Sequence, residues 1–181
     1  MGRQMAEYAA HAVLHFHRHM PRYAEHQRVA RWAPLEPVAA RDFAVGFMGL
    51  GVLGAQAAQL VAALGYPVLG WSRTPKSLPG VEGFAGDGGL AAFLARTRVL
   101  VNFLPLTDAT RGIIDARLLA GLPRGAFVVN PARGGHVVER DLLAALDSGH
   151  IAGAMLDVFE TEPLPAEHPF WKHPSVVVTP H

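Results

Sequence analysis

The sequence predicts an α/β fold with a doubly wound parallel sheet, that is, a sheet that carries helices on both faces. Short apolar runs recur along residues 43–179, and helical patterns of about a dozen residues separate most of them. The runs are nearly continuous rather than alternating, which is typical of strands buried on both faces. Half of the 181 residues are hydrophobic and 17% are charged, so the chain can bury a core of ordinary size.

The first expected element is a helix near the N-terminus, which Pro21 would end. Its apolar residues fall on one helical face: Met5, Ala9, Ala12, Val13, Phe16 and Met20. Pro34 and Pro37 interrupt residues 27–42, which are expected to be a connector. We therefore divide the chain into a linking or hinge helix with its connector, residues 1–42, and an α/β domain, residues 43–181.

Within the α/β domain, six strands are expected, at residues 43–49, 68–71, 99–104, 126–130, 152–156 and 175–179. Two helices have the clearest patterns. One covers residues 53–64 and stops at Gly65, and the other covers residues 138–146 and ends before Gly149. Strands that alternate with helices in this way imply right-handed crossovers between parallel strands.

Composition and charge exclude several classes of protein. Sixteen basic residues against 15 acidic ones give a net charge of +1, which would not attract nucleic acid. The absence of cysteine excludes disulfides and thiolate metal ligands and agrees with a reducing cytoplasm. Residues 43–71 carry no charge, but their glycines and Pro67 divide them into short elements, so no membrane span is expected. Charged residues interrupt the first 20, which argues against a signal peptide and for a soluble, cytoplasmic protein.

The strongest motif is a glycine-rich turn, GLGVLG at residues 49–54, between the first strand and helix of this domain. Gly49 would permit the tight turn, Gly51 would let the backbone approach a pyrophosphate, and Gly54 would let the helix pack closely on the strand. Val52 and Leu53 lie around the start of the helix, where free N–H groups and the helix dipole favour a phosphate. The motif predicts a dinucleotide site of the Rossmann type, with a purely structural turn as the alternative.

The end of the second strand favours NADP over NAD. NAD sites usually carry an acidic residue there, which binds the ribose 2′-hydroxyl. This chain has Ser72 and Arg73 instead, followed by Lys76. Arg73 and Lys76 would pair with a 2′-phosphate, so NADPH is expected to bind more tightly than NADH. The alternative is a basic loop that only contacts solvent.

Three ionisable residues follow the ends of later strands: Arg133, Glu162 and His181. The carboxyl ends of parallel strands lie at one edge of a sheet, so the three loops would meet in one crevice. Such a set suits the reduction of a 2-oxo acid, in which Arg133 holds the anion and His181 donates a proton as hydride arrives. Glu162 would orient the imidazole. Each residue alone could equally be an ordinary solvated loop residue.

Taken together, these motifs resemble those of the D-isomer-specific 2-hydroxyacid dehydrogenases. Within that family the chain is most similar to the bacterial glyoxylate/hydroxypyruvate reductases of the A type. The resemblance rests on GFMGLGVLG, WSRTPKSLPGVEGFAG, NPARG, LLAALDSG, GAMLDVFETEPLP and the final TPH.

The resemblance implies a role for each matching residue. Arg133, Glu162 and His181 would be the catalytic set, and Asp157 would bind the nicotinamide carboxamide. Ser72 and Arg73 would read the adenosine ribose or its 2′-phosphate. The cofactor cleft would be lined by a loop that contains Leu104, Pro105 and Thr107.

The resemblance also implies a function and an assembly. The protein would use NADPH to reduce glyoxylate to glycolate and hydroxypyruvate to glycerate, and it would form a homodimer in which the first helix, with Met5 and Phe16, meets the partner. Family members build a substrate domain from residues on both sides of the cofactor domain, so this chain is expected to be a fragment in which that domain is largely missing and which is inactive by itself. The alternatives are an NAD(P)-sensing corepressor on the same fold and a cofactor-free dimerisation module, which the intact glycine turn argues against.

The histidines of the first helix and the three tryptophans are minor features of the sequence. His11, His15 and His19 would form a stripe beside the apolar face of the first helix, and no metal site is expected from them. Trp32, Trp71 and Trp171 are too scattered for a stacking platform and are interpreted as packing or loop anchors.

Overall fold

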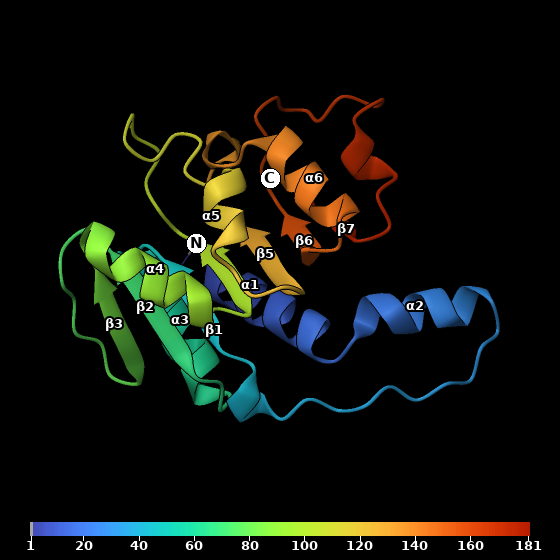
Figure 1. Ribbon diagram of the computed structural model, residues 1–181, viewed down its shortest axis with the longest axis horizontal. Helices are drawn as coiled ribbons and strands as arrows, with labels where there is room; N and C mark the ends of the chain where they lie inside the picture. Colours follow the sequence, from blue (N-terminus) through green and yellow to red (C-terminus); the bar gives the residue numbers. More distant parts are fainter. Residues whose placement is uncertain (1) are drawn as a thin grey trace.

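The computed structural model describes residues 2–181, which form an open sheet of seven parallel strands between two layers of helices (Figure 1). The strand order is β3-β2-β1-β4-β5-β6-β7. The strands are β1 (Val45–Met48), β2 (Val68–Ser72), β3 (Val81–Ala85), β4 (Val99–Asn102), β5 (Ala126–Asn130), β6 (Ile151–Leu156) and β7 (Val176–Val178). This arrangement confirms the predicted doubly wound sheet. The direction of winding reverses between β1 and β4, and ligands bind at such a switch point in open α/β sheets.

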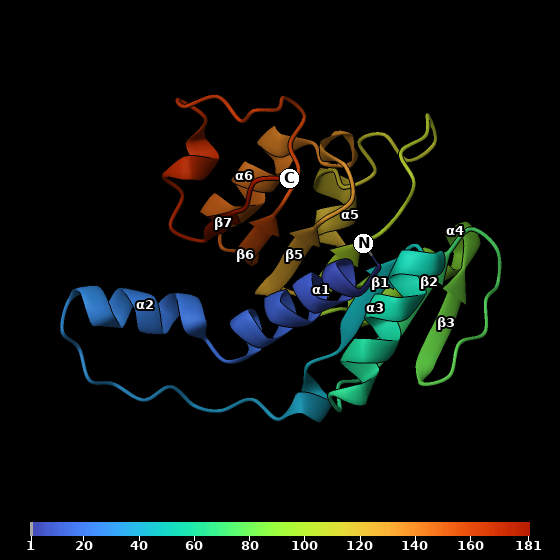
Figure 2. The ribbon, with the colours of Figure 1, turned by 180° about the vertical axis from the view of Figure 1, so that it is seen from behind.

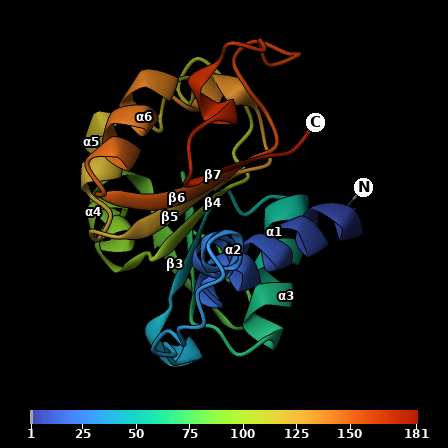
Figure 3. The ribbon, with the colours of Figure 1, turned by 90° about the vertical axis from the view of Figure 1, so that its right-hand side faces the viewer.

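Each face of the sheet has its own helices and its own core. One face carries α1 (Gly2–His17) and α3 (Val52–Ala63), which lie in front of the strands in Figure 2. The other carries α4 (Gly86–Arg96), α5 (Ala116–Ala120) and α6 (Glu139–Asp147). Figure 3 shows the two layers from the side. The central strands are buried on both faces, as their continuous apolar runs predict.

The six predicted strands and the two predicted helices of this domain are all present, with ends shifted by at most two residues. The edge strand β3 was not predicted. Its sequence, VEGFA, holds a charged residue and a glycine, and the strand is only partly buried. An edge strand buries less surface than a central one, so its apolar pattern is weak.

The prediction for the N-terminal helix was wrong about Pro21. The helix α1 ends at His17, and His19 adopts a left-handed conformation with φ of 57°. A second helix, α2 (Met20–Arg28), then begins, with Pro21 in its first turn. Proline is favoured at that position because its missing N–H would have no partner there anyway. The connector therefore starts after Arg28, and it holds one short 3₁₀ turn, η1 (Ala40–Asp42).

The helix α1 packs as an integral layer of the sheet. Phe16 is 2% exposed and stacks on Phe127 of β5, with ring centroids 4.4 Å apart. The expectation that a partner subunit covers Phe16 is therefore wrong, because this chain already buries it. His17 joins α1 to the loop before β2 and to the connector, since its Nδ1 lies 2.8 Å from the Tyr66 hydroxyl and its Nε2 lies 2.7 Å from the Val38 carbonyl oxygen. The division at residue 42 remains a proposal.

The three tryptophans differ in environment. Trp71 is buried, and its indole N–H donates to the Gly86 carbonyl. Trp171 donates to the Pro165 carbonyl, as a loop anchor would. Trp32 is 99% exposed on the connector, so the prediction that it is a packing or loop anchor is wrong within this chain. No helix within residues 2–181 is long and apolar enough to cross a bilayer, and residues 43–71 fold as β1, α3 and β2.

Candidate cofactor and catalytic site

The glycine-rich turn joins β1 to α3 at the switch point, and its three glycines have different surroundings. Gly49 has a φ of 95°, and a Cβ there would lie 2.7 Å from the carbonyl carbon of Phe103. A Cβ on Gly54 would collide with the Gly49 carbonyl. The fold therefore requires glycine at both positions. A Cβ on Gly51 would meet nothing within 4 Å, so this glycine leaves open space beside the turn.

The open space lies at the start of α3, where a phosphate would bind. Gly51 is the N-cap and offers no side chain to the helix. Among the described residues, the N–H groups of Val52 and Leu53 have no acceptor. Free N–H groups and the positive end of the helix dipole together attract an anion. The geometry thus fits the pyrophosphate of a dinucleotide.

The basic loop after β2 stands beside this turn. Ser72 is buried, and its hydroxyl donates to the Thr74 carbonyl over 2.7 Å, which folds the loop back on itself. Lys76 donates from Nζ to the Leu50 carbonyl over 2.9 Å, so its ammonium group lies on the glycine turn. Arg73 is exposed and has no hydrogen-bonding or ionic partner in residues 2–181. Its guanidinium is therefore available to a ligand.

Two buried asparagines, Asn102 and Asn130, connect the loops that follow β4 and β5. Asn102 donates from Nδ2 to Oδ1 of Asn130 over 3.0 Å, and both residues are fully buried. Asn102 Oδ1 accepts the Leu104 N–H, and Asn130 Nδ2 donates to the Arg133 carbonyl. The pair therefore fixes the predicted cofactor loop and the predicted catalytic arginine to each other. Neither residue was predicted from the sequence, although each is a polar residue at the end of an apolar strand.

The loop after β4 is held internally as well. Thr110 accepts the Thr107 N–H at its hydroxyl and donates to the Pro105 carbonyl over 2.6 Å. Leu104 is 9% exposed and belongs to the core, so only its backbone is available to a cofactor. Pro105 and Thr107 are both exposed.

The Arg133 carbonyl oxygen, which accepts from Asn130, also contacts a second side chain. This is His136, which lies in the short 3₁₀ turn η2 (Gly134–His136). His136 Nδ1 lies 3.1 Å from the Arg133 carbonyl oxygen. Burial lowers the pKa of His136, so the ring is neutral and Nδ1 carries the proton that it donates. A Cβ on Gly134 would collide with the Phe159 carbonyl, so glycine allows this turn to lie directly against the loop after β6.

The loop after β6 brings Glu162 to His181. His181 Nδ1 lies 2.8 Å from Glu162 Oε2, and the Phe159 N–H donates to Glu162 Oε1 over 3.0 Å. The hydrogen bond with His181, the Phe159 N–H and the charge of Arg133 hold the pKa of Glu162 below its ordinary value. The structure therefore brings Glu162 and His181 into contact and places Arg133 close enough to act on Glu162 electrostatically. A hollow of about 410 Å³ borders the pair.

Asp157 directly follows β6 at the same edge of the sheet. It accepts a hydrogen bond of 2.6 Å at Oδ1 from the Thr179 hydroxyl, and its own N–H donates to the Asn130 carbonyl. The residue predicted to bind the carboxamide therefore lies between the asparagine pair and the segment that ends at His181.

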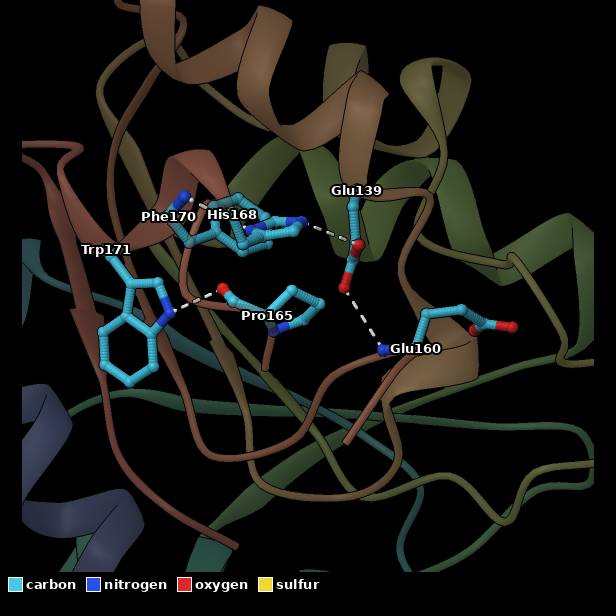
Figure 4. Close-up of polar contacts among 6 residues, drawn as sticks. All are labelled: Glu139, Glu160, Pro165, His168, Phe170 and Trp171. Carbon is cyan, nitrogen blue, oxygen red and sulfur yellow. Dashed lines mark hydrogen bonds and ion pairs between the residues drawn. The ribbon is translucent and has the colours of Figure 1, made fainter. Parts of the chain in front are cut away.

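Figure 4 shows how the rest of the loop after β6 is held. Glu139, at the start of α6, accepts the Glu160 N–H at Oε1 and the His168 Nε2–H at Oε2, each over 3.2 Å. His168 also accepts the Phe170 N–H at Nδ1, over 3.3 Å, which fixes its tautomer. The loop that carries Glu162 is thereby anchored to α6. The sequence analysis did not predict this anchor, because its members lie far apart along the chain.

Comparison with known proteins agrees with this geometry. Residues 10–181 match the sequence model of the family described as D-isomer specific 2-hydroxyacid dehydrogenase, NAD binding domain. Among solved structures, a D-isomer specific 2-hydroxyacid dehydrogenase from Xanthobacter autotrophicus Py2, in complex with NADPH and MES, is 50% identical, with a TM-score of 0.98. The match covers all of this chain and 57% of that one.

Two further structures are similar. The NADPH-dependent glyoxylate/hydroxypyruvate reductase of Sinorhizobium meliloti, in complex with NADP and sulfate, is 45% identical, with a TM-score of 0.96 over 100% of this chain and 58% of that chain. A probable 2-hydroxyacid dehydrogenase from Rhizobium etli, in complex with NADP, is 40% identical, with a TM-score of 0.95 over 99% of this chain and 58% of that chain. This chain thus spans less than two thirds of the length of these relatives.

Proposed function

Because this chain belongs to the D-isomer-specific 2-hydroxyacid dehydrogenases, we propose that it binds NADPH and takes part in the reduction of small 2-oxo acids. Glyoxylate and hydroxypyruvate are the proposed substrates, as in the Sinorhizobium reductase. One observation carries the proposal: the Glu162–His181 contact lies on the sheet edge that also holds an open phosphate cradle at Gly51.

The proposed mechanism assigns one step to each residue. Arg133 binds the substrate carboxylate and polarises the carbonyl group. The hydride for the carbonyl carbon would come from NADPH when it is bound at the glycine turn. His181 donates a proton to the carbonyl oxygen, so that a 2-hydroxy acid forms, and the neutral ring then takes a proton from solvent. Glu162 accepts the Nδ1–H of His181, which orients the ring and leaves Nε2 directed to the substrate.

The proposed cofactor preference rests on Arg73 and Lys76. One hydrogen bond to a charged group contributes about 1.5–3 kcal/mol, so NADPH should bind on the order of 10–100-fold more tightly than NADH. Calorimetric titration of the chain with each cofactor tests this. Arg73→Ala should remove most of the preference, whereas Arg117→Ala, at an exposed position on α5, should leave it unchanged. Equal affinity of the unaltered chain for NADPH and NADH would contradict the assignment.

We also propose that the protein is a homodimer whose partner covers the projecting α2 and connector. This arm exposes Trp32 by 99%, Val29 by 67% and Met20 by 44%. Trp32 also lines a hollow of about 640 Å³ on the same arm. Exposed apolar patches of this kind mark interaction surfaces. Sedimentation of the chain should show a dimer that Trp32→Ala weakens. The alternative role as a cofactor sensor is not favoured, because the matching family model and solved structures are those of dehydrogenases and reductases.

A further inference from the structure

Three polar side chains from distant parts of the chain form one hydrogen-bonded series at the cofactor edge. Tyr8 lies on α1, Thr179 follows β7, and Asp157 follows β6. The Tyr8 hydroxyl lies 2.9 Å from Thr179 Oγ1, although the two residues are 171 positions apart. Thr179 Oγ1 lies 2.6 Å from Asp157 Oδ1. The glycine turn, the catalytic pair and the basic loop take no part in this series.

The direction of the two hydrogen bonds follows from the donors available. An ionised carboxylate only accepts, so the single proton of the Thr179 hydroxyl must point to Asp157. Thr179 then accepts the proton of the Tyr8 hydroxyl. Backbone contacts hold both ends of the threonine–aspartate pair, since the Thr179 N–H donates to Leu156 and the Asp157 N–H to Asn130. In residues 2–181 the second carboxylate oxygen of Asp157 has no partner, so it is free to accept from a ligand.

The Tyr8 hydroxyl is protonated at physiological pH and can therefore donate a hydrogen bond. Burial raises the pKa of its hydroxyl to about 12, so the group stays protonated at physiological pH. The ring comes from α1, which is anchored by its packing on α3 and on Phe127. A partly buried phenol without a partner would be unfavourable, and the Tyr8 hydroxyl finds its partner in Thr179.

We propose that Tyr8 is a positioning residue for the nicotinamide end of the cofactor site. Through Thr179 it holds one oxygen of Asp157, so that the other oxygen faces the donor N–H groups of the carboxamide. This inference rests on the proposed function and adds to it a residue of the N-terminal helix. The hydrogen-bonded series does not reach Arg73, Lys76 or the glycine turn. A change at Tyr8 should therefore affect the nicotinamide end of the site and not the adenosine end.

The test compares two ligands on the same chain. NADPH carries the nicotinamide, whereas adenosine 2′,5′-bisphosphate carries only the end that the basic loop would bind. Tyr8→Phe removes one hydroxyl and should weaken NADPH binding by about 2- to 10-fold, as expected for one hydrogen bond. Its affinity for adenosine 2′,5′-bisphosphate should not change. Calorimetric titration measures both.

Two further variants sharpen the comparison. Tyr66→Phe is the matched control, because it also removes a hydroxyl that hydrogen-bonds a neighbour, here His17, and it should leave both affinities unchanged. Thr179→Val breaks the series at its centre and should weaken NADPH binding by itself. In the Thr179→Val background, Tyr8→Phe should have no further effect. If Tyr8→Phe does not fold, the two affinities of Thr179→Val provide the same test.

The outcomes separate this inference from the function on which it rests. If the unaltered chain binds NADPH and Tyr8→Phe binds it equally well, the inference is wrong and the proposed function stands. An equal loss for both ligands would also overturn it, because Tyr8 would then act on the whole fold. If the folded, unaltered chain does not bind NADPH at all, the proposed function fails and the inference fails with it.

Discussion

At the scale of single residues, Gly51 differs from the other two glycines of its turn. Its φ of −70° is open to any residue, and a side chain there would enter only the space proposed for the pyrophosphate. Gly51→Val should therefore abolish NADPH binding with little change in thermal stability. Gly54→Val should lower the stability itself, because its side chain would collide with the Gly49 carbonyl. Unchanged NADPH affinity in Gly51→Val would show that the cofactor does not lie on this turn.

The ionisation of Glu162 provides a second prediction at this scale. Because its contacts favour the charged form, its pKa lies below the ordinary 4.5. The stabilisation from these contacts is therefore fully present above pH 4.5 and is lost as the pH falls through the lowered pKa. His181→Ala removes the largest of these contacts and should move the Glu162 titration upward, as followed by carboxyl NMR. An unmoved titration would mean that the two side chains do not meet in solution.

Some site residues could be predicted from the sequence and others could not, for a physical reason. Gly49, Gly51 and Gly54 lie within one local motif, and Glu162 and His181 follow strand ends that a parallel sheet places at one edge. Asn102 and Tyr8 act through partners on other parts of the fold, Asn130 and Thr179. Which partner each of them meets depends on the packing of distant segments, so no local spacing could predict it.

At the scale of elements, α1 should contribute to stability mainly through the buried ring that it places against the sheet. Phe16→Ala should lower the free energy of unfolding by about 3–5 kcal/mol, because it leaves a cavity beside Phe127. Leu14, on the same helix, is 41% exposed, and Leu14→Ala should cost much less. Urea denaturation of the two variants measures both. Similar values for the two would mean that α1 is only loosely attached to the sheet.

The elements that the sequence analysis missed are those with little local signal. The strand β3 lies at the sheet edge, where half-burial leaves a mixed pattern. The helix α2 buries only one residue, His26, so it has no apolar face to recognise. Pro21 was interpreted as a helix end, whereas it opens the next helix, because proline suits both positions and only tertiary structure decides between them.

At the scale of the whole molecule, the fold class followed from the order of apolar runs, because each central strand is buried on both faces. The position of α1 did not follow, since an amphipathic helix can cover the sheet or a partner equally well. The site is similarly open to one side: Glu162 and His181 expose 36% and 50% of their side chains. At such exposed side chains, water competes with a bound substrate for their hydrogen bonds.

The last prediction concerns turnover, which requires that the substrate be held against His181. A displacement of about 1 Å at a reacting group can cost roughly 10²-fold in rate. We therefore expect the 181-residue chain to oxidise NADPH slowly or not at all with glyoxylate or hydroxypyruvate. A chimaera in which this chain replaces the matching 58% of the Sinorhizobium reductase should turn over readily, because the remainder would complete the site.

Variants of that chimaera test the assigned roles. His181→Ala should lower kcat by about 10²- to 10⁴-fold with little change in NADPH affinity, since proton transfer contributes about that much to a rate. Arg133→Ala should raise KM and lower kcat together, because it acts on the bound substrate and on the reacting carbonyl. Fast turnover by the 181-residue chain alone would show that these residues already contain a complete substrate site. A chimaera that binds NADPH and reduces neither substrate would show that the proposed reaction is wrong for this chain.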